Sequence, residues 1–212
     1  MKLYSYWRST TSYRVRAALN LKGLAYETVP VDLVAGDQRD ADYAALNPGL
    51  GVPTLVLDDG TVLTQSLAIL DYLDAIATPR LLPEDPLMRA KVMAAAHAVA
   101  LDIHPVNNLR VVQYLRKTHG ASADDAQGWM QHWMQSGFAA VEAMVSKDTP
   151  FAFGDTPDLA DICITSQLYN AHRWGVDLTA FPKLTRIEAA CLALPEIAAA
   201  HPDQQPDAKV TT

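Results

Sequence analysis

The spacing of hydrophobic and polar positions divides the chain into two halves of different character. In the first half, short alternating stretches typical of strands take turns with segments that have a helical period. The expected strands cover residues 2–6, 26–31, 54–57 and 61–63, and the expected helices cover 12–23, 40–46 and 66–77. Asp59-Gly60, between the last two strands, predicts a tight two-residue hairpin turn with positive φ angles. This order of elements indicates an α/β domain.

A proline-containing connection at 80–86 separates this half from one in which only helical patterns occur. The expected helices cover 88–116 with an interruption at Pro105, 122–145, 158–169, 184–193 and 196–200. The pattern therefore predicts two domains, 1–80 and 87–212, of which the second is all-α. The polar tail from Pro202 is expected to be loosely ordered or to lie on the surface.

Two local patterns of the second half favour a structural interpretation. Asp158-Leu159-Ala160-Asp161 is typical of a helix start whose first residue caps the helix. Aromatic and methionine side chains recur at helical spacing further upstream, which predicts core positions rather than a cofactor site. These residues are Trp129, Met130, Trp133 and Met134.

Composition and charge exclude several classes of protein. Of the 212 residues, 50% are hydrophobic and 19% charged, which is typical of a folded protein. A net charge of -7 makes nucleic acid an unexpected partner. Neither an apolar run long enough for a membrane nor a signal peptide is evident, so we expect a cytoplasmic protein. Cys163 and Cys191 lie in apolar contexts and predict core positions, without a disulfide or a metal site.

Val52-Pro53 stands at the start of a predicted strand, after a glycine-containing loop. A cis bond at this proline would leave the backbone of Val52 pointing outward, where an extended peptide could pair with it. The alternative is a strand-opening proline within a turn.

Gln65-Ser66 stands where a strand passes into a helix. Unpaired N–H groups and the helix dipole favour an anion at such a position, so Ser66 is a candidate for binding a carboxylate. The alternative is that Ser66 only caps the helix.

The loop after the first strand carries a cluster of hydroxyl groups from Ser9, Thr10 and Thr11. A thiolate or another anion held there gains both O–H donors and the helix dipole. We interpret Ser12 as the N-cap of the following helix, and Arg14 and Arg16 as a solvated or ion-paired face. Arg8 lies in the loop itself and is expected to point toward the bound molecule.

Together these segments resemble the zeta class of glutathione transferases. The resemblance is carried by the hydroxyl-rich stretch 9–16, by Val-Pro-Thr-Leu at 52–55, by Gln-Ser-Leu-Ala-Ile at 65–69 and by the all-α second half. It implies a thioredoxin-like N-terminal domain followed by an all-α C-terminal domain, a homodimer, and glutathione as the cofactor. The activity implied is cis–trans isomerisation of a maleyl oxo acid, a small dicarboxylate of aromatic catabolism.

The resemblance also implies roles for single residues. Ser9 would lie nearest the glutathione sulfur, with Thr11 as a second catalytic hydroxyl where the family usually has a cysteine. The other residues implied in glutathione binding are Thr10, Gln38, Val52, Gln65, Ser66, His104 and Asn108. Gln38 would reach the glycine end, and Gln65 and Ser66 the γ-glutamyl end.

Substrate carboxylates would be bound by arginines at positions 8, 110 and 173. The spacing of His104 and Asn108 places them on one helix face, whereas Arg110 would point elsewhere on a straight helix. Arg173 has an alternative role as a cation at a helix C-terminus, with Gly175 ending the helix. Arg110 favours maleylpyruvate over maleylacetoacetate as the substrate.

Two other functions stay open at this point. One is a general transferase that conjugates glutathione to electrophiles, and the arginines around the site argue against it. The other is a non-catalytic module that only binds glutathione or another ligand, since binding elements alone do not establish catalysis.

Overall fold

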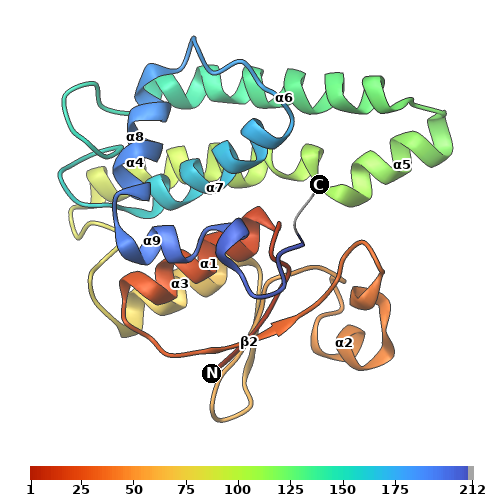
Figure 1. Ribbon diagram of the computed structural model, residues 1–212. Coiled ribbons are helices and arrows are strands. Elements are labelled where there is room, and N and C mark those ends of the chain that lie inside the picture. Colours follow the sequence, from red (N-terminus) through yellow and green to blue (C-terminus); the bar gives the residue numbers. More distant parts are fainter. Residues whose placement is uncertain (210–212) are drawn as a thin grey trace. The chain divides into compact units, whose positions relative to one another are not determined.

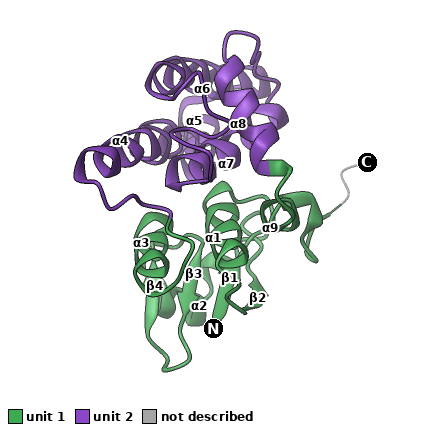
Figure 2. Ribbon diagram, turned by 90° about the vertical axis from the view of Figure 1, so that its left-hand side faces the viewer, with its two compact units in different colours: residues 1–80, 192–212 green, residues 81–191 purple. Residues whose placement is uncertain are grey.

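The computed structural model describes residues 1–209 (Figure 1). The chain forms two compact units, one made of residues 1–80 with the C-terminal segment from Leu192, the other of residues 81–191 (Figure 2). The sequence predicted a division into 1–80 and 87–212. The difference lies in the C-terminal segment, which packs with the first unit.

The first unit is built on a four-stranded sheet whose strand order is β2-β1-β3-β4. The strands are β1 (Lys2–Ser5), β2 (Glu27–Pro30), β3 (Thr54–Val56) and β4 (Val62–Thr64). β1 is parallel to β2 and antiparallel to β3, and β3 pairs antiparallel with β4. Every predicted strand is therefore present.

The hairpin between β3 and β4 differs in detail from the prediction. Leu57 donates its N–H to the carbonyl of Thr61, and Gly60 donates to the carbonyl of Leu57. Gly60 has φ +85°, and Asp59 is not among the residues with positive φ. The turn thus has three residues, and only one of them, Gly60, is in the left-handed conformation. A glycine adopts that conformation without strain.

The helices of the first unit are α1 (Thr10–Leu21), η1 (Asp37–Arg39), α2 (Ala41–Leu46), α3 (Ser66–Ile76), α9 (Pro195–Ala199) and η4 (Pro202–Gln204). Helix α1 packs against α3 and against α9, and Figure 1 shows it between them on one side of the sheet. Nine of the twelve residues of α1 are buried.

Arg14 and Arg16 do not form the solvated face that the sequence offered as one alternative, because both side chains are enclosed, at 1% and 0% exposure. Arg16 donates from Nε to the carbonyl of Ala200 at 3.1 Å and from its terminal nitrogens to Ser5 Oγ and to the carbonyl of Trp7 at 3.0 and 3.1 Å. A buried guanidinium needs such acceptors. Arg16 therefore ties α1 both to β1 and to the C-terminal segment.

The second unit is all-helical, as predicted. Its elements are α4 (Pro86–His97), η2 (Ala98–Ile103), η3 (Pro105–Asn107), α5 (Leu109–His119), α6 (Ala123–Met144), α7 (Leu159–Arg173) and α8 (Pro182–Leu192), which ends where the C-terminal segment begins. The helix expected at 88–116 is interrupted more strongly than predicted. A π-helical turn and a short 3₁₀ turn flank His104, because Pro105 has no N–H to continue an α-helical ladder.

Helix α7 is buried along nearly its whole length. Asp158 is its N-cap, and Asp158 and Asp161 form a complete capping box, which confirms the structural interpretation of this motif. Both cysteines are buried and are not joined in a disulfide, and burial raises the pKa of the Cys191 thiol. None of the helices within residues 1–209 is long and apolar enough to span a membrane.

The prediction for the aromatic and methionine positions of α6 is half right. Met130 and Met134 are buried, whereas Trp133 is 37% exposed and the indole of Trp129 donates to the carbonyl of Val106 at 2.8 Å. The inward stripe of α6 runs through Ala126, Met130, Met134, Phe138 and Val141. The two tryptophans flank that stripe instead of belonging to it.

Candidate functional site

Ser9 is the N-cap of α1, and the prediction that Ser12 caps this helix is wrong. Ser9 has extended backbone angles, and its Oγ accepts the N–H of Ser12 at 3.1 Å. Ser12 lies inside the first turn, where its side chain is buried. The helix thus begins earlier than predicted, in the middle of the hydroxyl cluster.

The hydroxyl groups of Ser9 and Thr11 lie 2.8 Å apart, and Thr11 Oγ1 also donates to the carbonyl of Val52 at 2.8 Å. A carbonyl only accepts, so the single hydrogen of Thr11 is directed to Val52. The hydrogen shared between the two hydroxyls must then come from Ser9. Because Ser9 is only half-buried, its O–H can turn from Thr11 to an incoming anion.

Val52 lies two residues before β3, and its bond to Pro53 is cis, which is one of the two alternatives that the sequence left open. The loop before it is fixed by Asn47, whose Nδ2 donates to the carbonyl of Gly51 at 2.9 Å and to Thr54 Oγ1 at 3.0 Å. The carbonyl of Val52 accepts from Thr11 through one lone pair, and the second remains for another donor.

Helix α3 begins at Ser66, with Gln65 in the N-cap position and no side chain capping the helix, so Ser66 is not the cap. Gln65 has φ +68° and is exposed, whereas Ser66 is buried. The guanidinium of Arg14 donates to Ser66 Oγ at 3.4 Å. Since a guanidinium only donates, Ser66 accepts this bond and keeps its own hydrogen for another acceptor. The start of α3 can therefore bind a carboxylate.

Gln38 lies in η1 and is 7% exposed. Its Oε1 has no hydrogen-bond partner within the described part of the chain. A buried acceptor of this kind is rare without a partner, so this amide suits a donor supplied by a ligand. Thr10, in contrast, is buried in the first turn of α1.

The predicted site residues of the second unit are arranged differently from the expectation. His104 lies between η2 and η3, and Asn108 is the N-cap of α5, where its Oδ1 accepts the N–H of Arg110 at 3.1 Å. The shared helix face expected for His104 and Asn108 is wrong, because the chain leaves the α-helical path between them. Arg110 is exposed in the first turn of α5.

Arg173 is the last residue of α7 and is exposed. Its guanidinium lies 5.2 Å from the centre of the Trp174 ring, a cation–π contact. Gly175, with φ +64°, ends the helix, as the sequence suggested. Both interpretations of Arg173 stay open on this geometry.

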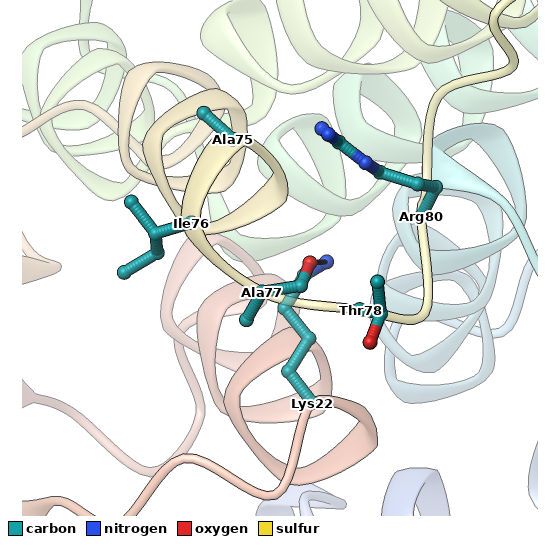
Figure 3. A pocket seen from close by; sticks show the side chains of 6 residues that line it. All are labelled: Lys22, Ala75, Ile76, Ala77, Thr78 and Arg80. Carbon is teal, nitrogen blue, oxygen red and sulfur yellow. Dashed lines mark hydrogen bonds between the residues drawn. The ribbon is translucent and has the colours of Figure 1, made fainter.

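A shallow hollow elsewhere on the first unit is lined by Lys22 and Arg80 among others (Figure 3). The ammonium of Lys22 donates to Asp74 Oδ1 and to the carbonyls of Ala77 and Pro79, so its three hydrogens are all used. This cation holds the end of α3 and has no donor left for a ligand. Within residues 1–209 no group of potential metal ligands is gathered.

Sequence reasoning missed Arg14 and Asp207. Arg14 contacts Ser66, and Asp207 Oδ2 accepts the N–H of Trp7 at 3.1 Å, two residues before Ser9. The contact of Arg14 depends on the packing of α3 against α1, which no local pattern announces. No local signal announces the contact of Asp207, since it joins positions 200 apart in the chain.

Comparison with known proteins agrees with this geometry. Residues 8–76 match the family model of the glutathione S-transferase N-terminal domain. Maleylacetoacetate isomerase of Pseudomonas aeruginosa is 46% identical over 210 residues, 98% of either chain. A bacterial maleylpyruvate isomerase, described as a zeta-class glutathione S-transferase, superposes with a TM-score of 0.96 at 44% identity, covering 99% of this chain and 100% of its own. This chain belongs to the zeta class of glutathione transferases.

A further zeta-class relative shows what such a site binds. Maleylacetoacetate isomerase of Methylobacterium extorquens AM1, solved with malonate and glutathione bound, has a TM-score of 0.95 at 41% identity and covers 99% of this chain and 100% of its own. Membership of the zeta class confirms the resemblance inferred from the sequence. It also confirms the thioredoxin-like N-terminal domain and the mostly helical remainder.

Proposed function

We propose that the protein is a glutathione-dependent cis–trans isomerase that converts a maleyl oxo acid into its fumaryl isomer. The observation that carries this function is the hydroxyl pair at the start of α1, in which Ser9 holds a hydrogen that can turn toward an anion. The relatives named for the same reaction support it, and so does the bound glutathione of the M. extorquens enzyme.

The residues of the first unit suit the parts of glutathione. Gln65 and Ser66 would hold the γ-glutamyl carboxylate at the uncapped start of α3, and Arg14 adds positive charge behind Ser66. The backbone of Val52 would pair with the cysteinyl residue. Gln38 would reach the glycine end, where its unpartnered Oε1 can accept only an N–H and not the carboxylate.

Bound glutathione would supply a thiolate that adds reversibly to the double bond of the substrate. The carbon–carbon bond is then single and can rotate, and elimination of the thiolate restores the double bond in its trans form. A free thiol of this kind has a pKa of about 8.5, so little thiolate exists at pH 7. Ser9 stabilises the anion by donating its hydrogen, and the dipole of α1 acts in the same direction. Thr11 accepts the hydrogen of Ser9 while no anion is bound, and donates its own hydrogen to the carbonyl of Val52.

The substrate carries carboxylates, which planar guanidinium groups bind at two points. Arg8, whose guanidinium lies 4.3 Å from the ring centre of Trp7, and Arg173 are the proposed carboxylate ligands. Arg110 is a further candidate and favours maleylpyruvate, the shorter oxo acid. Malonate in the M. extorquens structure supports a dicarboxylate as the substrate class.

His104 and Asn108 complete the set of glutathione ligands in this proposal, with Asn108 also capping α5. Thr10, although buried, stays in the predicted set. We further propose a homodimer, a cytoplasmic location, and no nucleic-acid or membrane partner. Light scattering at micromolar concentration tests the dimer, which a mass near the 23.1 kDa of one chain would contradict.

The decisive experiment is incubation of the protein with glutathione and maleylpyruvate, followed by NMR of the product and titration of free thiol. An isomerase forms fumarylpyruvate over many turnovers without loss of thiol. Stoichiometric loss of thiol would instead mark a conjugating transferase. Glutathione binding without any product would mark a non-catalytic binding module.

A further inference from the structure

The C-terminal segment reaches two separate loops of the first unit. Asp207 Oδ2 accepts the N–H of Trp7 at 3.1 Å, and Lys209 Nζ donates to Asp32 Oδ2 at 2.7 Å. Trp7 belongs to the loop that leads to Ser9, and Asp32 to the loop that leads to Gln38. Residues close together near the end of the chain thus contact both loops that carry proposed glutathione ligands.

The loop before α1 is fixed at its main chain from two sides. Trp7 donates its N–H to Asp207, and its carbonyl accepts from Arg16 at 3.1 Å. Ser9 donates its N–H to the carbonyl of Tyr6 at 2.9 Å, which closes the turn directly before the helix. The bond from Trp7 to Asp207 is part-buried, so loss of the Asp207 carboxylate would leave the N–H of Trp7 without its protein acceptor in a place only partly open to water.

The second loop is organised around Asp32. Its Oδ1 accepts the N–H groups of Val34 and Ala35 at 2.9 and 3.1 Å, and its carbonyl accepts those of Gly36 and Asp37. Lys209 takes the remaining oxygen, Oδ2. The bond from Lys209, followed by the backbone bonds, holds the pKa of the Asp32 carboxyl below its usual range.

The segment that carries Asp207 and Lys209 is itself anchored to the first unit. The carbonyl of Ala200 accepts from the buried Arg16, and the ring of His201 lies edge-on to Tyr13 at 5.8 Å. Gln205 Nε2 donates to the carbonyls of Ala199 and His201 at 3.0 and 2.9 Å. The C-terminal segment is therefore held in place before it reaches Asp207 and Lys209.

We propose that Asp207 and Lys209 are positioning residues for glutathione binding, because they hold the loops of Ser9 and Gln38 in the conformation that the tripeptide needs. This inference rests on the proposed function of those loops. Loops that are ordered before binding lose less conformational entropy when the ligand arrives, and the ligand binds more tightly. Neither residue is required to touch glutathione.

The contacts of Asp207 and Lys209 are expected to contribute unequally to glutathione affinity. Asp207 makes a charge-assisted bond to a part-buried amide, so its loss should raise the glutathione Kd by roughly 5- to 30-fold. Lys209 is 74% exposed, and an ion pair of that kind contributes little, so its loss should raise the Kd by no more than about 2-fold.

The experiment measures glutathione binding by titration calorimetry and amide hydrogen exchange of residues 6–9 and 32–38 in the full-length chain. The variants are Asp207→Ala, Asp207→Asn and Lys209→Met. Asp207→Asn keeps an acceptor oxygen and serves if the alanine variant folds poorly. The controls are Glu196→Ala, an exposed acid of the same segment, and Lys2→Met, whose ion pair with Glu27 is also exposed.

We expect Asp207→Ala to bind glutathione more weakly and to exchange faster at 6–9, with the asparagine variant between it and the wild type. Lys209→Met should speed exchange at 32–38, and the controls should change neither quantity. Unchanged affinity and exchange in the Asp207 variants would overturn the inference. A wild-type protein that binds no glutathione would contradict the proposed function instead, and the exchange rates would still report whether the tail holds the loops.

Discussion

The N-termini of α1 and α7 are both capped by side-chain oxygens, but only the cap of α1 is open to a ligand. Asp158 Oδ1 accepts the N–H groups of Ala160 and Asp161, and the oxygens of Asp161 accept those of Ala152 and Asp158 at 2.7 and 2.8 Å. All of these groups are buried. Ser9 accepts only one N–H, is half-buried, and shares its hydrogen with Thr11.

The two helix starts differ in whether the capping group still has a hydrogen to donate to a ligand. The side-chain oxygens that cap α7 are buried and already accept backbone N–H groups, so this helix start is closed to a ligand. A serine that caps with its oxygen still owns a hydrogen, which a ligand can receive. A helix N-terminus is therefore a candidate catalytic site when its cap is a solvent-accessible hydroxyl group.

The largest expected effect is loss of stability at the closed helix start. Asp161→Ala removes both acceptors of the N–H groups of Ala152 and Asp158, which stay buried. Each such group costs about 1–3 kcal/mol, so we expect the free energy of unfolding to fall by about 2–6 kcal/mol. Urea denaturation measures this change, and a fall below about 1 kcal/mol would mean that water replaces the carboxylate.

The same pair of acids should make stability depend on pH. Burial, and then the neighbouring Asp158, raises the pKa of Asp161 to about 8 from 3.8. The folded protein thus keeps a proton that the unfolded chain releases. The stabilisation is complete below about pH 4 and is lost as the pH rises toward about 8, by at most about 1.4 kcal/mol per pH unit.

Thermal melts between pH 4 and pH 9 test this dependence. Asp161→Asn is the matched variant, because an amide cannot ionise and should flatten the profile. A wild-type profile as flat as that of the variant would show that Asp161 is ionised in the fold over this range.

At the open helix start, the expected loss is mainly one of activity. Ser9→Ala removes the hydrogen proposed to stabilise the thiolate, a bond worth about 1.5–3 kcal/mol, so turnover at saturating glutathione should fall roughly 10- to 150-fold. Loss of the cap should lower stability by only about 1 kcal/mol. Turnover and the pKa of the bound thiol are the measurements.

Ser66→Ala is the control for Ser9→Ala. A lost contact to a remote carboxylate can be offset by more glutathione, so this variant should recover its rate at saturation. If Ser9→Ala kept wild-type turnover with an unchanged thiol pKa, Thr11 or a backbone N–H would be the better candidate for the catalytic donor.

The arginines beside the two helices extend the comparison, since Arg8 lies just before α1 and Arg173 ends α7. Loss of a carboxylate-binding guanidinium in Arg8→Met or Arg173→Met should weaken apparent substrate binding roughly 10- to 150-fold, with little change in glutathione affinity. Lysine should restore only part of this loss. An Arg173 that only stabilises its helix would be fully replaced by lysine, and its methionine variant would melt earlier with unchanged substrate dependence.

The sequence predicts well what is decided locally. The strands, the position of the turn before Thr61 and the cap at Asp158 depend on neighbouring residues, whereas the type of that turn and the cap of α1 at Ser9 were predicted wrongly. The burial of Arg14 and Arg16 does not depend on neighbouring residues, because it requires α3 and the C-terminal segment to cover α1. The partners of Asp207 and Lys209 are likewise set by the path of the chain, not by any local pattern.

The smallest expected effect concerns Asp158, and it separates the two members of the closed capping box. Oδ1 of Asp158 alone accepts both N–H groups, from Ala160 at 2.7 Å and from Asp161 at 3.2 Å. Asp158→Asn keeps such an oxygen, and asparagine is as good an N-cap as aspartate, so the free energy of unfolding should change by less than about 1 kcal/mol. Asp161→Asn cannot do the same, because both of its oxygens are acceptors and an amide nitrogen would face an N–H. Urea denaturation of the two variants side by side should therefore give unequal losses, and equal losses would mean that the negative charge of the box, rather than its hydrogen-bond geometry, closes this end of α7.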